Sequence, residues 1–100
     1  MKLGILVNSD RHLSAIVGLT RTAVARGHSV QIFAMDSGTR LLEEAAYRDL
    51  AALDGVSMSY CDHSAKELEV NTTAVPENIE CSSQFSNAAM HHNADKVLVL

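Results

Sequence analysis

The sequence predicts an α/β fold, a three-layer α/β/α sandwich on a mostly parallel sheet of four to five strands. Short apolar runs alternate with segments of helical periodicity, and turn residues separate them. No internal repeat, low-complexity segment or linker divides the 100 residues. Strands that alternate with helices pair in parallel through right-handed crossovers, which place helices on both faces of the sheet. We therefore expect residues 1–100 to form a single domain.

The first half of the chain is predicted to hold two buried strands and two helices. The strands are apolar runs with little polar face, and a glycine follows each helix as a C-cap. The turn after the first strand supplies the N-cap candidates Asn8, Ser9 and Asp10. The four segments are residues 2–7, 13–26, 29–34 and 39–53. The apolar stripe expected for the last of them is Leu41, Leu42, Ala45, Ala46, Leu50 and Leu53.

The second half of the chain begins with a strand in which apolar residues alternate with serine. This alternation indicates that one face of the strand is less deeply buried than the first strand. A loop with the only proline comes later, and Ser82 or Ser83 is the expected N-cap of the final helix. The expected segments are a strand at 56–60, a short helix at 64–68, a loop at 71–78, a short additional strand near Ile79, a helix to about 92 and a last strand at 96–100.

Composition and charge exclude two classes of partner. The formal net charge is −4, and the eight basic residues are scattered rather than clustered, so the basic face that nucleic-acid binding requires is missing. The N-terminal apolar run is too short for a secretory signal, and no stretch approaches the length of a membrane span. We therefore expect a cytoplasmic protein whose two cysteines are not a structural disulfide.

Candidate reactive residues follow the predicted strands. Ligands and reactive groups of open parallel sheets gather at the carboxyl ends of the strands, where this chain places Asn8 to Asp10, residues 35–38 and Cys61 to His63. Cys61 comes directly after a strand and before a helix start, whose backbone N–H groups stabilise a thiolate. A protonated His63 adds to this effect, whereas Asp62 opposes it. An equally weighted alternative is that Cys61 is an unreactive, small apolar residue at the end of a strand.

Cys81 and the histidines are weaker candidates. Cys81 also precedes a helix and has two interpretations, a resolving thiol for Cys61 or an inert buried cysteine. The pair His91 and His92, together with Cys61, His63 and Cys81, offers donors for zinc. Neighbouring helical residues point about 100° apart, however, and no CxxC or HExxH occurs, so we expect no metal. GxGxxG and GxxxxGK[ST] are also missing, and we expect no nucleotide or flavin cofactor.

Four segments resemble the DsrE/DsrF-like family of sulfur-relay proteins, which includes the TusD and DsrE subunits. MKLGILVNSD is similar to the first strand of that family, and ARGHSVQIFAMDSGTRLL to its second-strand segment. GVSMSYCDHSA resembles the stretch that carries the sulfur-accepting cysteine, and SSQFSNAAMHHNADKVLVL the closing helix and strand. The resemblance implies that Cys61 carries a persulfide. The position of His63 in the same loop makes it a candidate supporting acid or base.

The resemblance also implies partners and an assembly. Sulfur donor and acceptor proteins are the expected partners, and a trimer or hexamer of this chain is the expected oligomer. Two competing functions remain open at this point. One is a thiol-disulfide redox protein that uses Cys61 and Cys81, and the other is a non-enzymatic oligomeric binding module in which the cysteines are incidental.

Overall fold

The computed structural model describes all residues 1–100 and contains one parallel sheet of five strands. The strand order is β4-β3-β2-β1-β5, so β1, β2 and β3 are inner strands and β4 and β5 are edges. This confirms the predicted α/β class, including the short strand near Ile79. The strands are β1 (Lys2–Val7), β2 (Ser29–Ala34), β3 (Val56–Cys61), β4 (Ile79–Ser82) and β5 (Lys96–Val99).

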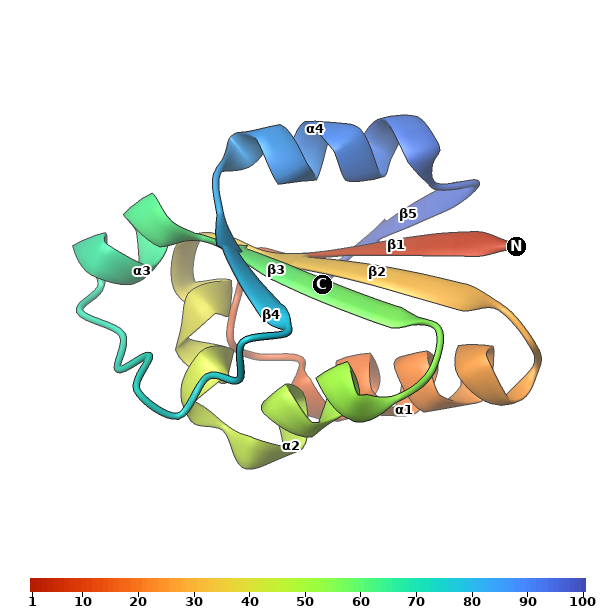
Figure 1. Cartoon of the computed structure of the whole chain (residues 1–100), viewed down its shortest axis with the longest axis horizontal. Helices are drawn as coiled ribbons and strands as arrows, with labels where there is room; N and C mark the ends of the chain where they lie inside the picture. Colours follow the sequence, from red (N-terminus) through yellow and green to blue (C-terminus); the bar gives the residue numbers. More distant parts are fainter.

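Helices cover both faces of the sheet, unequally. Figure 1 shows α1 and α2 together on one face, α4 alone on the other, and α3 beyond the ends of the strands. The α-helices are α1 (Leu13–Ala25), α2 (Ala45–Arg48), α3 (Asp62–Glu67) and α4 (Gln84–Asn93), and two 3-10 helices are η1 (Asp36–Glu43) and η2 (Asp49–Ala52). No helix is long and apolar enough to cross a lipid bilayer.

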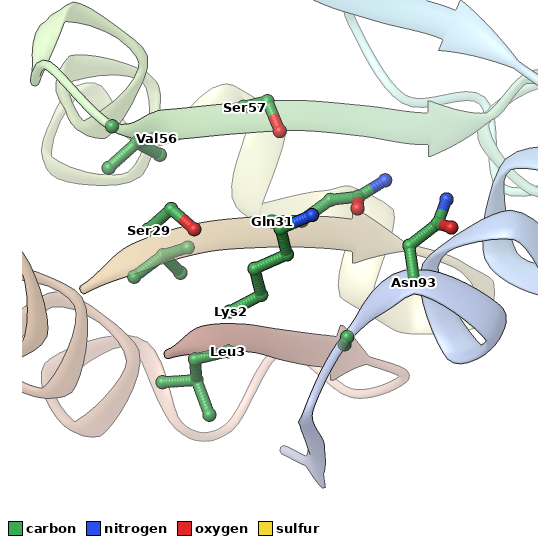
Figure 2. A pocket seen from close by; sticks show the side chains of 10 residues that line it. Lys2, Leu3, Ser29, Gln31, Val56, Ser57 and Asn93 are labelled. Carbon is green, nitrogen blue, oxygen red and sulfur yellow. The ribbon is translucent and has the colours of Figure 1, made fainter.

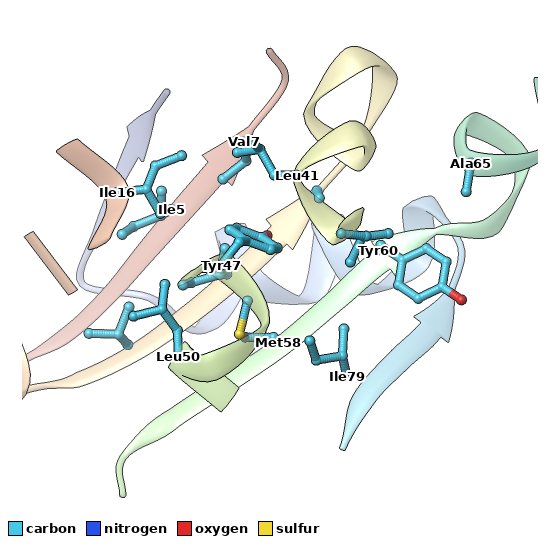
Figure 3. Close-up of a cluster of buried hydrophobic side chains, with 14 of the residues drawn as sticks. Ile5, Val7, Ile16, Leu41, Tyr47, Leu50, Met58, Tyr60, Ala65 and Ile79 are labelled. Carbon is cyan, nitrogen blue, oxygen red and sulfur yellow. The ribbon is translucent and has the colours of Figure 1, made fainter. Parts of the chain in front are cut away.

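The main hydrophobic core lies between the sheet and the α1/α2 layer (Figure 3). It contains 15 buried residues, drawn from every second position of the inner strands and from the facing helices. Ile5, Ile32 and Met58 stand in register on β1, β2 and β3, while Ile16 and Leu50 come from the helical layer. Burying one such side chain contributes about 1.5–3 kcal/mol, so this layer is the main source of stability.

A smaller core lies on the opposite face, under α4. Phe33, Cys61 and Met90 form it, with partly buried Leu6 and Val97 at its margin. The side chains of a strand alternate between faces, so Cys61 points away from the main core and toward α4. The cysteine of interest therefore belongs to the thinner of the two apolar layers.

The helix predicted over residues 39–53 is wrong as a single helix. Glu44 adopts an extended conformation (φ −98°, ψ 125°) that separates η1 from α2. The break turns Tyr47 fully into the core and leaves the two alanines before it exposed, whereas the expected stripe had the alanines inside. Arg48 Nη1 donates to the carbonyl of Leu42 at 3.1 Å, which satisfies a carbonyl that the broken helix leaves without a helical partner.

The N-cap predicted for α4 is confirmed, whereas the N-cap predicted for α1 is wrong. The Ser83 hydroxyl accepts the N–H of Phe85 at 3.2 Å and caps α4, as predicted. At α1 the N-cap is His12, without a side-chain cap, so the expected capping by residues 8–10 is wrong. The Ser9 hydroxyl instead donates to the carbonyl of Leu100 at 3.4 Å, because β5 ends next to β1.

Candidate thiol site

A cleft of about 680 Å³ lies at the carboxyl ends of β2, β3 and β4. This is the edge at which an open parallel sheet gathers ligands. Three chain segments build it: the start of the loop after β2, the junction of β3 and α3, and the end of β4 with the start of α4 (Figure 1). Its lining residues are Met35, Asp36, Cys61, Asp62, His63, Ser64, Ser82, Ser83 and Gln84.

Cys61 occupies the inner wall of this cleft. It is the last residue of β3 and the N-cap of α3, with an extended backbone (φ −79°, ψ 112°). Its side chain belongs to the cluster of Phe33 and Met90 on the α4 face, and the residue is 4% exposed. The thiol therefore meets apolar side chains on one side and the cleft on the other.

Hydrogen-bond donors around Cys61 favour its thiolate. Burial raises the pKa of this thiol, but hydrogen bonding from the hydroxyl and backbone N–H of Ser64, from the Gln84 side chain and from the His63 N–H outweighs it. The net pKa of Cys61 is therefore lowered below its ordinary value. A cysteine that packs in a core without such donors has a raised pKa, so this environment is typical of a reactive thiol.

Asp62 and His63 lie on the first turn of α3, and each has a partner side chain four residues further along the helix. The Lys66 ammonium stands 2.9 Å from the Asp62 carboxylate, which lowers the pKa of Asp62 and raises that of Lys66. His63 Nε2 is 3.7 Å from the Glu67 carboxylate, and the imidazole is largely exposed at the rim of the cleft. The structure thus brings two parts of His63 to the site: the backbone N–H lies next to the Cys61 thiol, and the imidazole lies at the rim of the cleft.

Cys81 is adjacent to Cys61 along the sheet and yet lies on the other face. β4 pairs with β3 so that Cys81 stands opposite Tyr60, and Ser82 opposite Cys61. Residues paired across neighbouring strands point to the same face of the sheet, so the Cys81 side chain lies on the same face as Tyr60. Both thiols are free, and Cys81 is exposed at the sheet edge. Burial first, then hydrogen bonding with Cys81, raises the pKa of Tyr60 to about 12. The structure does not bring the two cysteines together.

Met35 and the start of η1 form the opposite wall of the cleft and are held tightly to β1. A Cβ atom on Gly38 would lie 2.1 Å from the Val7 carbonyl oxygen, so only glycine fits there. The N–H of Met35 donates to the same carbonyl at 2.9 Å. Asp36 has a left-handed backbone (φ 48°), and its carbonyl accepts the Thr39 hydroxyl at 2.7 Å. These contacts fix the backbone of Asp36 at the wall of the cleft.

Several residues differ from their sequence-based assignment. Asn8, Ser9 and Asp10 do not line the cleft, although they also follow a strand. Ser64 and Gln84 were not proposed from the sequence. Ser64 carries a signal in hindsight, because it stands three residues after Cys61, the spacing from an N-cap to the first free N–H groups. Gln84 carries none, since it arrives from a helix 23 positions along the chain.

The donors considered for zinc are dispersed. His91 and His92 are exposed near the end of α4, away from the cleft lining. No group of three or more histidine, cysteine, aspartate or glutamate side chains lies close enough together to hold a metal ion.

A second polar hollow, of about 580 Å³, lies on the α4 face toward the amino ends of the strands. Figure 2 shows Gln31 on β2 and Asn93 at the end of α4 approaching it from opposite sides, with Lys2 and Ser57 nearby. The hollow exists because α4 alone does not cover this half of the sheet. It contains neither cysteine nor histidine, so the nucleophile lies at the other edge.

An open parallel sheet with a donor-surrounded thiol at the carboxyl end of an inner strand defines a small three-layer α/β protein with a thiol site. No family model and no curated protein matches the sequence. Among solved structures, the chain is similar to the YchN protein of E. coli, with a TM-score of 0.70 and 14% identity over 99% of this chain and 97% of that one. A conserved protein of unknown function from Bacteroides thetaiotaomicron has a TM-score of 0.78 and 14% identity, over 99% and 94%. These similarities show a YchN-like fold, in agreement with the DsrE-like fold expected from the sequence.

Proposed function

We propose that this protein is a sulfur-relay protein, in which Cys61 accepts sulfane sulfur as a persulfide and passes it on. The observation that carries the proposal is the position of Cys61 at the end of β3 and the start of α3, in the wall of a cleft that His63, Ser64 and Gln84 also line. A thiolate is the nucleophilic form of cysteine, and fixed donors stabilise it without reorganisation. The YchN-like fold and the DsrE-like sequence segments support the same assignment.

The chemistry requires no net oxidant or reductant. The Cys61 thiolate attacks the outer sulfur of a donor persulfide, a new S–S bond forms, and the donor's own S–S bond breaks. The donor leaves as a thiolate with the electron pair, and Cys61 holds the persulfide with its proton. In the second half, an acceptor thiolate attacks the outer sulfur and Cys61 leaves as a thiolate. The hydrogen-bond donors around Cys61 therefore act in both halves of the relay. They stabilise the thiolate that attacks the persulfide, and they stabilise the same thiolate when it leaves in the second half.

Partner proteins complete this proposal. In this proposal His63, exposed at the rim of the cleft, is the acid that protonates the departing thiolate of the sulfur donor. The sulfur donor and acceptor are taken to be proteins, and the protein is taken to assemble as a cytoplasmic trimer or hexamer, as the DsrE-like resemblance implies. Assembly suits a chain of 100 residues, whose small core benefits from further burial.

The two competing functions assign different roles to Cys61 and Cys81. A thiol-disulfide protein needs Cys61 and Cys81 on one side of the sheet, and their opposite faces disfavour it. A binding module with an inert Cys61 agrees with the 4% exposure of that residue. The lowered pKa of Cys61 favours reactivity over this alternative.

Mass spectrometry of the intact protein after incubation with cysteine persulfide tests the proposal. The natural chain and Cys81→Ser are expected to gain the mass of one sulfur atom, and Cys61→Ser is expected to gain none. Circular dichroism checks that all three proteins keep the fold. Loading that persists in Cys61→Ser, or its absence from the natural chain, would contradict the proposed function.

A further inference from the structure

The first turn of α4 carries a pair of side-chain amides beside the cleft. Gln84 lines the cleft, and Asn87 lies three residues further along the helix. The Nδ2 of Asn87 donates to the Oε1 of Gln84 at 3.1 Å. Side chains three positions apart in a helix are neighbours, so the two amides meet on one face of α4. This bond occupies the carbonyl oxygen of Gln84 and leaves its Nε2 hydrogens for the sulfur atoms of the cleft.

The nitrogen end of the Gln84 amide faces sulfur. Its Nε2 donates to the Sδ of Met35 at 3.8 Å, and Met35 packs against the cluster that contains Cys61. A thioether has no hydrogen to donate, so the nitrogen of the amide, rather than its oxygen, has to point this way. A thioether is also a weak acceptor, which leaves the same N–H available to a thiolate. Hydrogen bonding from Gln84 is accordingly one of the causes that lower the pKa of Cys61.

Asn87 makes its bond to Gln84 at a cost to its own hydrogen bonding. The Oδ1 of Asn87 is buried and has no hydrogen-bond partner. A buried carbonyl oxygen without a partner destabilises a folded protein, and an apolar side chain of the same shape avoids that penalty. The asparagine is therefore explained by what its Nδ2 does to Gln84 rather than by the stability of α4.

We propose that Asn87 is a positioning residue of the thiol site, which fixes the Gln84 amide so that its N–H points at the sulfur of Cys61. This inference rests on the proposed sulfur-relay function. Gln84 donates to the thiolate before loading and to the outer sulfur of the persulfide afterwards. The opposite orientation of the amide would turn its carbonyl oxygen, the negative end of the dipole, toward an anionic sulfur and disfavour it.

Alkylation of Cys61 in the Cys81→Ser background tests the positioning. Gln84→Leu removes the donor, so alkylation near neutral pH should slow about tenfold and its pH profile should move upward. Asn87→Leu keeps the donor and loses only its orientation, which should slow alkylation about fivefold. Added to Gln84→Leu, the change Asn87→Leu should have no further effect, because Asn87 acts through Gln84. Asn93→Leu, at an exposed position on the last turn of α4, should leave the rate unchanged.

Urea denaturation separates positioning from a structural role. The titratable groups that line the cleft, Asp36, Asp62 and His63, are the same in every variant. Because the Oδ1 of Asn87 is unpaired, Asn87→Leu should not lower the free energy of unfolding although it slows the alkylation of Cys61. A loss of stability together with further slowing in the Gln84→Leu background would make Asn87 a structural residue and overturn the inference. An unchanged alkylation rate in Asn87→Leu would overturn it as well.

Sulfur loading from cysteine persulfide distinguishes this inference from the function on which it rests. The natural chain should load fastest, Asn87→Leu more slowly and Gln84→Leu most slowly. Equal loading rates in all three proteins overturn the positioning role while the relay function stands. No loading of the natural chain overturns the relay function and the role of the amide pair toward a persulfide, whereas the alkylation rates still decide whether Asn87 positions Gln84.

Discussion

Cys61 and Cys81 occupy neighbouring strands, one register position apart, and have opposite surroundings. Cys61 is buried against Phe33 and Met90 and faces hydrogen-bond donors, whereas Cys81 is exposed at the sheet edge beside Tyr60. The pleat of the sheet makes this difference, because it sends adjacent positions to opposite faces. Proximity in the sheet therefore does not give two cysteines a shared chemistry, and each has to be understood from the layer that it faces.

The largest expected effect comes from truncating a buried side chain of α4, the helix that covers Cys61. Met90 is fully buried, so Met90→Ala should lower the free energy of unfolding by about 2–5 kcal/mol in urea denaturation. It should also speed alkylation of Cys61 and leave Cys81 unchanged, because solvent gains access to one thiol only. Phe85→Ala is the matched control on the same helix: Phe85 is 79% exposed, and its loss should change stability by less than about 0.5 kcal/mol. Equal stability of the two variants would contradict the packing of α4 on the sheet.

The donor environment of Cys61 gives the next largest effect. Because hydrogen bonding lowers the pKa of this thiol, its alkylation rate should rise with pH through a midpoint below that of an unperturbed cysteine. Ser64→Ala removes a hydroxyl donor and should move the midpoint upward. Loss of a hydrogen bond to a charged group corresponds to about a tenfold lower rate near neutral pH.

Two controls accompany that profile. Ser14→Ala removes an exposed serine from α1 and should leave the alkylation of Cys61 unchanged. Cys81, followed in Cys61→Ser, should not respond to Ser64→Ala. A profile of Cys61 that is the same with and without the Ser64 hydroxyl would mean that this donor does not act on the thiol.

The smallest expected effect is a null result under oxidation. Disulfide geometry needs Cβ atoms that point toward each other, and Cys61 and Cys81 point to opposite faces. Mild oxidation should therefore form no bond between them, and non-reducing peptide mapping should find Cys81 free or joined to a second chain. An intramolecular Cys61–Cys81 disulfide in the folded protein would revive the redox function and require a different β3–β4 register.

Much of the fold, and the place of Cys61 in it, were predictable from the sequence. Buried strands and an amphipathic helix depend on local periodicity, and the position of Cys61 between a strand and a helix followed from it. The break at Glu44 was not predictable, because burial of Tyr47 in the tertiary core overrides a pattern that favours one continuous helix. The sequence also did not predict that Cys61 and Cys81 point to opposite faces of the sheet. That arrangement depends on the register of β4 against β3, which no local pattern specifies.

The contact between Gly38 and the Val7 carbonyl has a consequence for how solvent reaches the site. It ties one wall of the cleft to β1, an inner strand that contributes Ile5 and Val7 to the main core, so amide hydrogens such as that of Met35 should exchange only as slowly as the core opens. The other wall is the first turn of α4, held by a single serine cap and free to fray. Exchange with deuterium should therefore begin on the α4 side, and Cys61 should gain access to water through opening of that helix turn rather than through movement of η1.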